Sequence, residues 1–330
     1  MSRLGRILLG VLIVLVLLVV VGPLVIPVRP LEGLVPPRQL ADPDSKFMEV
    51  DGLQFHYKQA GEGRPAMLLL HGFSSSTFTW RNVSGPLSAL GTVVSYDRPS
   101  SGLTERPLAG HPRMEGGARW TGANPYSPQE QADQAVEIMD KLGIDRAVLI
   151  GNSAGGTVAM LTALEHPERV AALVLVDPAI YAGGGAPAWI RPLLGTPQFQ
   201  RIGPLSGRFL AGSGDRLLTL AWHDPSKVTP DVLEGYRKAT QAENWDQGLW
   251  ELTKASQDLN LETRLAEVTQ PTLVITGDDD RIVPTEQSVR LAAELPNAEL
   301  VVIPQCGHVP QEECPGPWLD AVTEFVERFK

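Results

Sequence analysis

The chain has few cysteines and histidines, and it lacks a cluster of basic residues. Its 330 residues include two cysteines and six histidines, with no HExxH motif and no cysteines and histidines at metal-ligand spacing. Lysine and arginine form no runs, and the formal net charge is -10 at pH 7. Because phosphate binding requires a concentrated basic surface, nucleic acid is not expected as a partner. The sequence therefore predicts a protein without a metal ion or a cofactor.

Charge is also absent from a long stretch near the amino terminus. Residues 7–26 (ILLGVLIVLVLLVVVGPLVI) contain no charged side chain, and 20 residues are enough for a helix to cross the hydrocarbon core of a bilayer. The alternative is a cleaved secretory signal, whose apolar core is usually shorter and whose cleavage site is poor here. We therefore predict an uncleaved transmembrane or signal-anchor segment over residues 1–28, which contacts the lipid bilayer through residues 7–26.

The basic residues around this segment give a weak indication of its orientation. Arg3, Arg6 and the terminal amine precede it, whereas Arg29 and Arg38 follow it. The positive-inside rule then favours a cytoplasmic amino terminus. We expect a single-pass protein of the cell membrane whose catalytic domain is extracytoplasmic. Residues 29–45 are rich in proline and predict a semi-rigid linker.

The most informative motif is AVLIGNSAGG, over residues 147–156. An apolar strand that turns sharply into a helix leaves room only for small residues at Gly151 and Gly155, and it exposes the hydroxyl of Ser153. The Ala154 N–H would lie at the amino terminus of the helix, where an oxyanion can bind. Alone, this pattern also matches a flexible turn, but the flanking strand-like and helix-like segments favour a nucleophile elbow.

Three further segments resemble the α/β-hydrolase superfamily in motif and in order, and together with the elbow they cover residues 47–330. MLLLHGF (67–73) resembles the strand and oxyanion loop, which implies that the Phe73 N–H is the second oxyanion donor. TGDDDRIVP (276–284) resembles the loop of the catalytic acid and implies Asp280, with Asp279 as the alternative. QCGHVPQEECP (305–315) resembles the loop of the catalytic histidine and implies His308.

These three residue types form a functional unit in serine hydrolases. The hydroxyl of Ser153 needs a base, and the unperturbed pKa of histidine suits His308 to that role. A carboxylate at Asp280 would fix the tautomer of the ring and stabilise the imidazolium. Cys306 and Cys314 flank His308, and the sequence leaves open whether they are free thiols or a disulfide.

The remaining pattern predicts the architecture of residues 46–330. The Asp51-Gly52 pair indicates a hairpin, after which strands and helices alternate as in a mostly parallel sheet covered by helices on both faces. We expect Asp97 to be a structural turn residue and His56 to lie on a strand surface. The alternation stops at about residues 181–269, which resembles the helical cap insertion of the α/β-hydrolase fold.

Two classes of function agree with these features. The first is a membrane-anchored serine hydrolase that cleaves carboxylic esters, most of all lipophilic ones. Among enzymes, the alternative is hydrolysis of a carbon–carbon bond, because Gly-Asn-Ser-x-Gly-Gly also resembles the motif of the meta-cleavage-product hydrolases. Against this alternative, Val309 stands where those enzymes tend to carry tryptophan. The second class is a non-catalytic binding protein on the same fold, in which the triad is usually broken.

Overall fold

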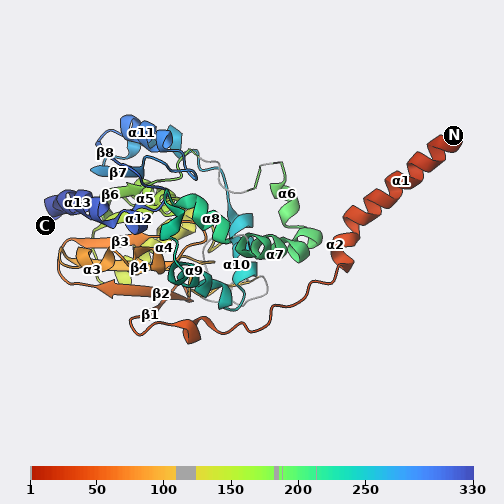
Figure 1. Cartoon of the computed structure of the whole chain (residues 1–330), viewed down its shortest axis with the longest axis horizontal. Coiled ribbons are helices and arrows are strands. Elements are labelled where there is room, and N and C mark those ends of the chain that lie inside the picture. Colours follow the sequence, from red (N-terminus) through yellow and green to blue (C-terminus); the bar gives the residue numbers. More distant parts are fainter. Residues whose placement is uncertain (1, 109–123, 182–185, 188, 213) are drawn as a thin grey trace.

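The centre of the structure is an eight-stranded sheet in the order β1-β2-β4-β3-β5-β6-β7-β8 (Figure 1). The computed structural model describes residues 2–108, 124–181, 186–187, 189–212 and 214–330. The strands are β1 (Lys46–Val50), β2 (Leu53–Ala60), β3 (Ala66–Leu70), β4 (Thr92–Tyr96), β5 (Ala147–Asn152), β6 (Val170–Val176), β7 (Thr272–Gly277) and β8 (Ala298–Ile303). The pairs β1–β2 and β2–β4 are antiparallel, and all other pairs are parallel. The prediction of a mostly parallel sheet is confirmed.

The hairpin between β1 and β2 forms at the expected Asp-Gly pair. Asp51 and Gly52 have φ angles of 46° and 78°, the left-handed values that a tight two-residue turn requires at both positions. Glycine adopts this region without a steric penalty, and aspartate tolerates it better than most residues. The hairpin therefore places two antiparallel strands before the first parallel one.

Helices cover both faces of the sheet. On one face Leu68 and Leu70 of β3 belong to the apolar core to which α4 (Pro128–Lys141), α5 (Ala154–Glu165) and α11 (Thr285–Glu294) also contribute. On the other face Met67 and Leu69 of the same strand pack with α3 (Ser84–Leu87) and α13 (Pro315–Val326). Alternate side chains of a strand point to opposite faces, so a strand between two helical layers must be apolar throughout. Short 3-10 helices lie at η1 (Pro37–Leu40), η2 (Thr77–Trp80), η3 (Pro167–Arg169), η4 (Pro225–Lys227), η5 (Lys238–Gln241), η6 (Leu261–Thr263), η7 (Leu265–Glu267) and η8 (Glu327–Phe329).

Between β6 and β7 the chain leaves the sheet and forms a group of helices, called the inserted helices below. These are α6 (Arg191–Leu194), α7 (Pro197–Gly212), α8 (Gly214–Ala221), α9 (Pro230–Arg237) and α10 (Trp245–Ala255). Helix α7 packs closely on α10, because a Cβ atom added at Gly203 would lie 2.2 Å from the ring of Trp250. The segment predicted as a cap spans these helices, but residues 182–185, 188 and 213 of it lie outside the described residues.

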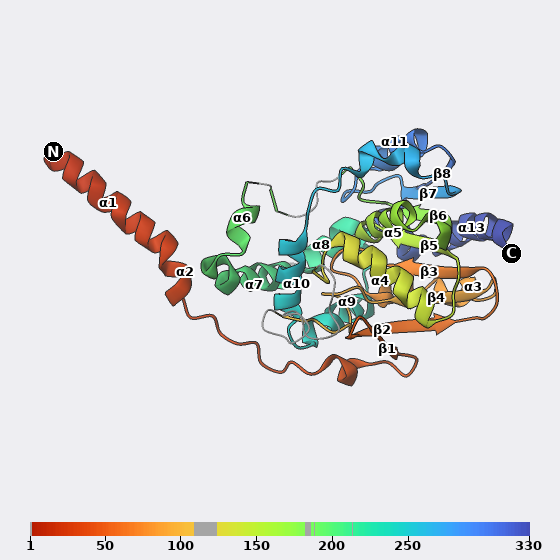
Figure 2. The same ribbon diagram turned by 180° about the vertical axis from the view of Figure 1, so that it is seen from behind.

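The amino-terminal helix α1 (Arg3–Val20) extends away from the rest of the molecule, with the short helix α2 (Gly22–Val25) after it (Figures 1 and 2). None of the residues of α1 is buried, and its length and hydropathy would suit either a membrane span or a signal sequence. The end of α1 and the chain after it contact α7. The Gln198 side-chain amide donates to the carbonyl of Val20 at 3.1 Å, and the Arg201 guanidinium donates to that of Ile26 at 3.1 Å. The apolar helix is therefore connected directly to the inserted helices.

Candidate active site

Ser153 lies at the junction of β5 and α5, in a backbone conformation that few residues adopt. Its φ and ψ are 53° and -119°, a strained region that persists only where the surroundings enforce it. The flanking glycines are required by contact: a Cβ atom at Gly151 would lie 2.5 Å from the carbonyl oxygen of Gly155, and one at Gly155 would lie 2.0 Å from that of Leu70. The tight turn that the sequence predicts therefore depends on close contacts between backbone segments, which only glycine permits at these two positions.

The structure brings His308 and Asp280 together. The distance from His308 Nδ1 to Asp280 Oδ2 is 2.7 Å, and both residues are buried. The other oxygen of this carboxylate accepts hydrogen bonds from the backbone N–H groups of Ile282 at 2.8 Å and Val283 at 3.0 Å. A carboxylate fixed in this way on Nδ1 leaves Nε2 as the ring nitrogen that can accept a proton.

The alternative acid, Asp279, faces other partners. Its carboxylate lies 2.8 Å from Nδ1 of His223 and accepts from the Arg281 side chain. The hydrogen bond from Arg281 is the main reason that the pKa of Asp279 lies below its usual value. Asp280 is therefore the acid that the fold directs to His308.

The loop after β3 lies directly beside the elbow. A Cβ atom at Gly72 would be 3.1 Å from the Asn152 side-chain oxygen and 3.3 Å from Ser153 Cβ, so the peptide that carries the Phe73 N–H lies next to the serine. Ala154 is the first residue of α5, and its N–H is one of those that the helix leaves unpaired. Phe73 and Ala154 remain the predicted oxyanion donors.

His71 supports this loop and takes no part in proton transfer. Its Nδ1 donates to the carbonyl of Gly72 at 2.8 Å, and its Nε2 accepts from the backbone N–H of Arg98 at 3.0 Å. Burial, together with the charge of Arg98, lowers the pKa of His71 to about 3. The ring is therefore neutral, which suits a residue that supports the loop through hydrogen bonds.

Ser153 and His308 line one cavity of about 400 Å³. Its apolar wall comes mainly from the inserted helices and the histidine loop, with Leu210, Leu217, Leu218, Trp245, Leu249 and Val309. Four serines besides Ser153 line it as well, at positions 74, 75, 100 and 101. A concave apolar cavity with a few convergent polar groups is the usual form of a small-molecule site.

The role of Asn152 could not be predicted from the sequence. Its side-chain amide donates to the carbonyl of His308 at 3.1 Å and to that of Val176 at 3.2 Å. Asn152 therefore ties the histidine loop to the residue before the nucleophile. The motif contains this asparagine, but only the folded chain shows which backbone groups it bonds.

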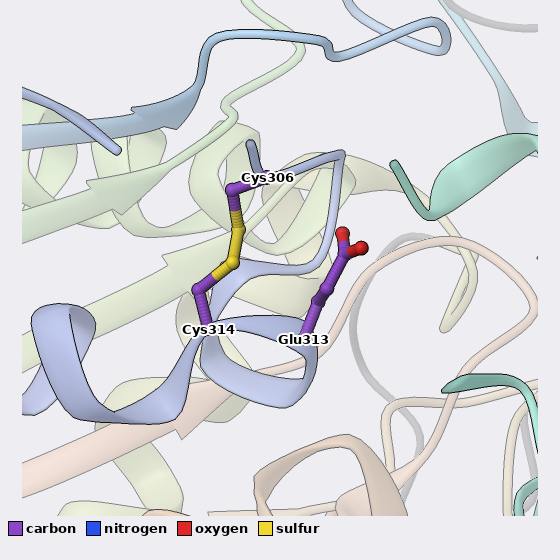
Figure 3. Close-up of side chains that lie close together, drawn as sticks. All are labelled: Cys306, Glu313 and Cys314. Carbon is purple, nitrogen blue, oxygen red and sulfur yellow. A yellow bond between two sulfur atoms is a disulfide. The ribbon is translucent and has the colours of Figure 1, made fainter. Parts of the chain in front are cut away.

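Glu313 fixes the other side of the histidine loop. Its carboxylate accepts from the backbone N–H of Gly307 at 2.8 Å, of His223 at 3.0 Å and of Asp224 at 2.7 Å. Cys306 and Cys314 on the same loop form a disulfide, which decides the question that the sequence left open (Figure 3). The loop is thus closed covalently on itself and joined through Glu313 to the segment after α8.

The expectation for His56 was wrong. It is buried, with Nδ1 2.6 Å from Asp97 Oδ2 and Nε2 2.8 Å from Ser45 Oγ. Asp97 also accepts from the backbone N–H groups of Thr77 and Leu103, so its predicted structural role is confirmed. Burial opposes the charge on Asp97, but His56 and the backbone donors hold its pKa below the usual range. Strand periodicity missed His56 because the chain before β1 covers its face.

The family profile of the alpha/beta hydrolase fold matches residues 65–315. The chain belongs to this family. A 2-hydroxy-6-oxononadienedioate/2-hydroxy-6-oxononatrienedioate hydrolase of Burkholderia vietnamiensis is 31% identical, over 86% of this chain and 96% of the relative. Among solved structures, the meta-cleavage product hydrolase of Pseudomonas fluorescens is 26% identical with a TM-score of 0.64, over 86% of this chain and 97% of that one. A membrane phospholipase A has the same identity and TM-score over 98% of both chains. The chain is therefore a hydrolase.

Proposed function

We propose that this α/β hydrolase is a membrane-anchored serine hydrolase that cleaves carboxylic esters, most of all lipophilic ones. The observation that carries the proposal is that an exposed apolar helix is joined to the wall of the Ser153 cavity: α7 contacts the chain after α1 and also supplies Leu210 to the cavity. An anchor in this position concentrates the enzyme at the membrane, into which lipophilic esters partition. The match to a membrane phospholipase A supports the proposal, because it extends over nearly the whole chain.

The proposed reaction has two stages. Ser153 Oγ attacks the ester carbonyl while His308 Nε2 takes its proton, and the N–H groups of Phe73 and Ala154 stabilise the oxyanion. Collapse of this intermediate breaks the ester bond, and His308 returns the proton to the leaving alkoxide. Water then attacks the acyl-enzyme with His308 as base again, which releases the acid and regenerates Ser153. Asp280 stabilises the imidazolium throughout and keeps its own charge.

The second candidate is hydrolysis of a carbon–carbon bond in a meta-cleavage product. Relatives named for this reaction are 29 to 32% identical to the chain, and they support it better than ester cleavage. One feature of the cavity also favours it. Arg106 lines the cavity and is buried, its guanidinium donates to the carbonyls of Gly102 and Thr104, and its Nε has no partner among the described residues. Such a cation suits the carboxylate of a dienoate substrate.

A parallel substrate screen decides between these candidates. For ester cleavage we expect kcat/KM on p-nitrophenyl esters to rise from acetate to medium chains, by about fourfold for each CH2 buried, until the cavity is full. A lipid monoester should be cleaved and a meta-cleavage dienoate should not. Arg106→Met should leave the ester series unchanged but weaken any turnover of the dienoate. Preference for acetate would contradict the lipophilic site, and efficient cleavage of the dienoate alone would establish the second candidate.

The membrane anchor is tested separately. Full-length protein should fractionate with membranes and resist alkaline carbonate, whereas a chain that begins at Leu40 should be soluble and active on short esters. As a matched control, Leu12→Lys combined with Val16→Lys places charge in the middle of the apolar stretch and should abolish membrane retention. Full-length protein that stays soluble with its amino terminus intact would refute the anchor.

Extracytoplasmic placement of the catalytic domain is part of the same proposal. The Cys306–Cys314 disulfide supports it, since disulfides persist in oxidising compartments.

A further inference from the structure

Asp177, the first residue after β6, is fully buried at the carboxyl end of the sheet. Its Oδ1 accepts hydrogen bonds from the Thr276 hydroxyl at 2.7 Å and from the Gly277 N–H at 3.2 Å. Its Oδ2 is also buried, yet it receives no hydrogen bond from the described residues. A buried carboxylate oxygen without a donor is costly, so this atom requires an explanation.

The explanation lies in its neighbour. One carboxylate oxygen of Asp177, one of Asp280 and one ring nitrogen of His308 all lie within 4.8 Å of one another. Two buried carboxylates at this separation cannot both be ionised at neutral pH, because the like charges repel in a medium that solvates them poorly. The pair therefore retains one proton.

The hydrogen bonds decide which of the two acids retains the proton. Asp280 accepts two backbone N–H groups on Oδ1 and faces His308 Nδ1 with Oδ2, so each of its oxygens already has a hydrogen-bond partner. Asp177 has donors on one oxygen only. Burial and then the charge of Asp280 raise the pKa of Asp177 well above its usual value. The proton therefore belongs on the free oxygen, Oδ2 of Asp177, which becomes a donor.

We propose that Asp177 is a positioning residue of the active site: as a neutral carboxylic acid it donates a hydrogen bond to Asp280 and holds that carboxylate against His308. This rests on the Ser153, Asp280 and His308 mechanism proposed above, for either substrate class. Asp177 touches no reacting atom. It acts by fixing Asp280 and by spreading the negative charge that His308 experiences.

Two substitutions separate this role from a merely structural one. Asp177 has a φ of 45°, a left-handed conformation that asparagine and glycine both tolerate, so neither substitution strains the backbone. Asp177→Asn has the shape of the neutral acid, and its NH2 group can donate to Asp280 while its oxygen keeps the bonds from Thr276 and Gly277. Asp177→Gly removes the donor altogether.

The expected results follow from the charge on each variant. Asp177→Asn should keep kcat within about threefold of the wild type, whereas Asp177→Gly should lower kcat about tenfold, the effect of losing one hydrogen bond to a charged group, with KM little changed. The acid limb of kcat/KM reports the pKa of His308, which must be neutral to act as base. Without the donor, Asp280 presents a more concentrated charge, which favours the imidazolium and raises the pKa of His308. The acid limb should therefore move to higher pH in Asp177→Gly and stay in place in Asp177→Asn.

The direction of the shift also shows when the proposal is wrong. Among the described residues, the titratable groups that face Asp177 are Asp280 and His308. If Asp177 were ionised, Asp177→Asn would remove a negative charge near His308, lower the pKa of His308 and move the acid limb to lower pH, and that result would overturn the proposal. An unchanged profile and rate in a folded Asp177→Gly protein would overturn it too. Failure of the triad itself is recognised separately, because Ser153→Ala would then retain the activity of the wild type.

Discussion

Ser153→Ala is expected to abolish hydrolysis, with a loss in kcat of about 10⁴-fold or more, and to abolish labelling by a fluorophosphonate probe. The reason is geometric, since Ser153 is the hydroxyl at the turn between β5 and α5, in the cavity that His308 also lines. Removing one oxygen atom does not alter the backbone contacts of the elbow, so the melting temperature should stay near that of the wild type.

His308→Ala should be as damaging as Ser153→Ala, and the double variant should be no worse than either single one, because the residues of a triad act as a unit. A matched control is His166→Ala, which removes another His–Asp pair, to Asp133 at 2.6 Å, at the surface of the sheet's helical layer. That variant should keep full activity. Turnover near the wild-type rate in Ser153→Ala would end the serine-hydrolase proposal. A wild type that shows neither turnover nor probe labelling would instead favour the non-catalytic class.

The parts of the site that could be predicted from the sequence are those fixed by local contacts. Backbone atoms within a few residues of Ser153 or in the adjacent strand leave no room for a Cβ atom at Gly151 or Gly155. A short sequence motif is therefore enough to predict the elbow. The Asp51-Gly52 turn can be predicted for the same reason, because it depends on the φ angles that these two residues themselves adopt. Asp280 and His308 were placed by the order of family motifs, and the fold brings these two together.

The supporting residues could not be predicted, because their roles depend on contacts between distant parts of the chain. Asn152 bonds the carbonyl of a residue 156 positions away, and Asp177 bonds Thr276, 99 positions away. No periodicity in the sequence reports such pairs. His56 illustrates the opposite error, because its strand position indicated an exposed side chain while residues before β1 fold back over it. Tertiary packing determines which polar groups are buried, and a buried polar group requires a hydrogen-bond partner.

The substrate is the least predictable feature for a related reason. An apolar anchor and an apolar cavity favour lipophilic esters as substrates, whereas the Gly-Asn-Ser motif and the named relatives favour hydrolysis of a carbon–carbon bond. The same nucleophile, base and oxyanion donors serve both reactions, so the catalytic residues carry little information about the bond that breaks. That information lies in groups such as Arg106 on the cavity wall.

Asp280→Asn is the second substitution with a very large expected effect, a loss in kcat of about 10⁴-fold. An amide at this position has no charge to stabilise the imidazolium. Its NH2 group can also donate to Nδ1, which leaves the proton of the neutral ring on Nε2, where it cannot accept the proton of Ser153. The backbone N–H groups of Ile282 and Val283 can still bond the amide oxygen, so the loop should keep its fold.

Asp279→Asn is the matched control, because Asp279 is the adjacent residue and also pairs with a histidine. Its partners are His223 and Arg281, and its side chain is 32% exposed, so the substitution removes solvent-screened contacts worth about 1 kcal/mol or less. We expect kcat within about threefold of the wild type for Asp279→Asn, measured on the same ester beside Asp280→Asn. The reverse pattern, an inactive Asp279→Asn and an active Asp280→Asn, would show that the acid acts from Asp279 and that His308 changes partners when substrate binds. It would also remove the basis for a positioning role of Asp177, since that role requires the working carboxylate to be the one that Asp177 faces.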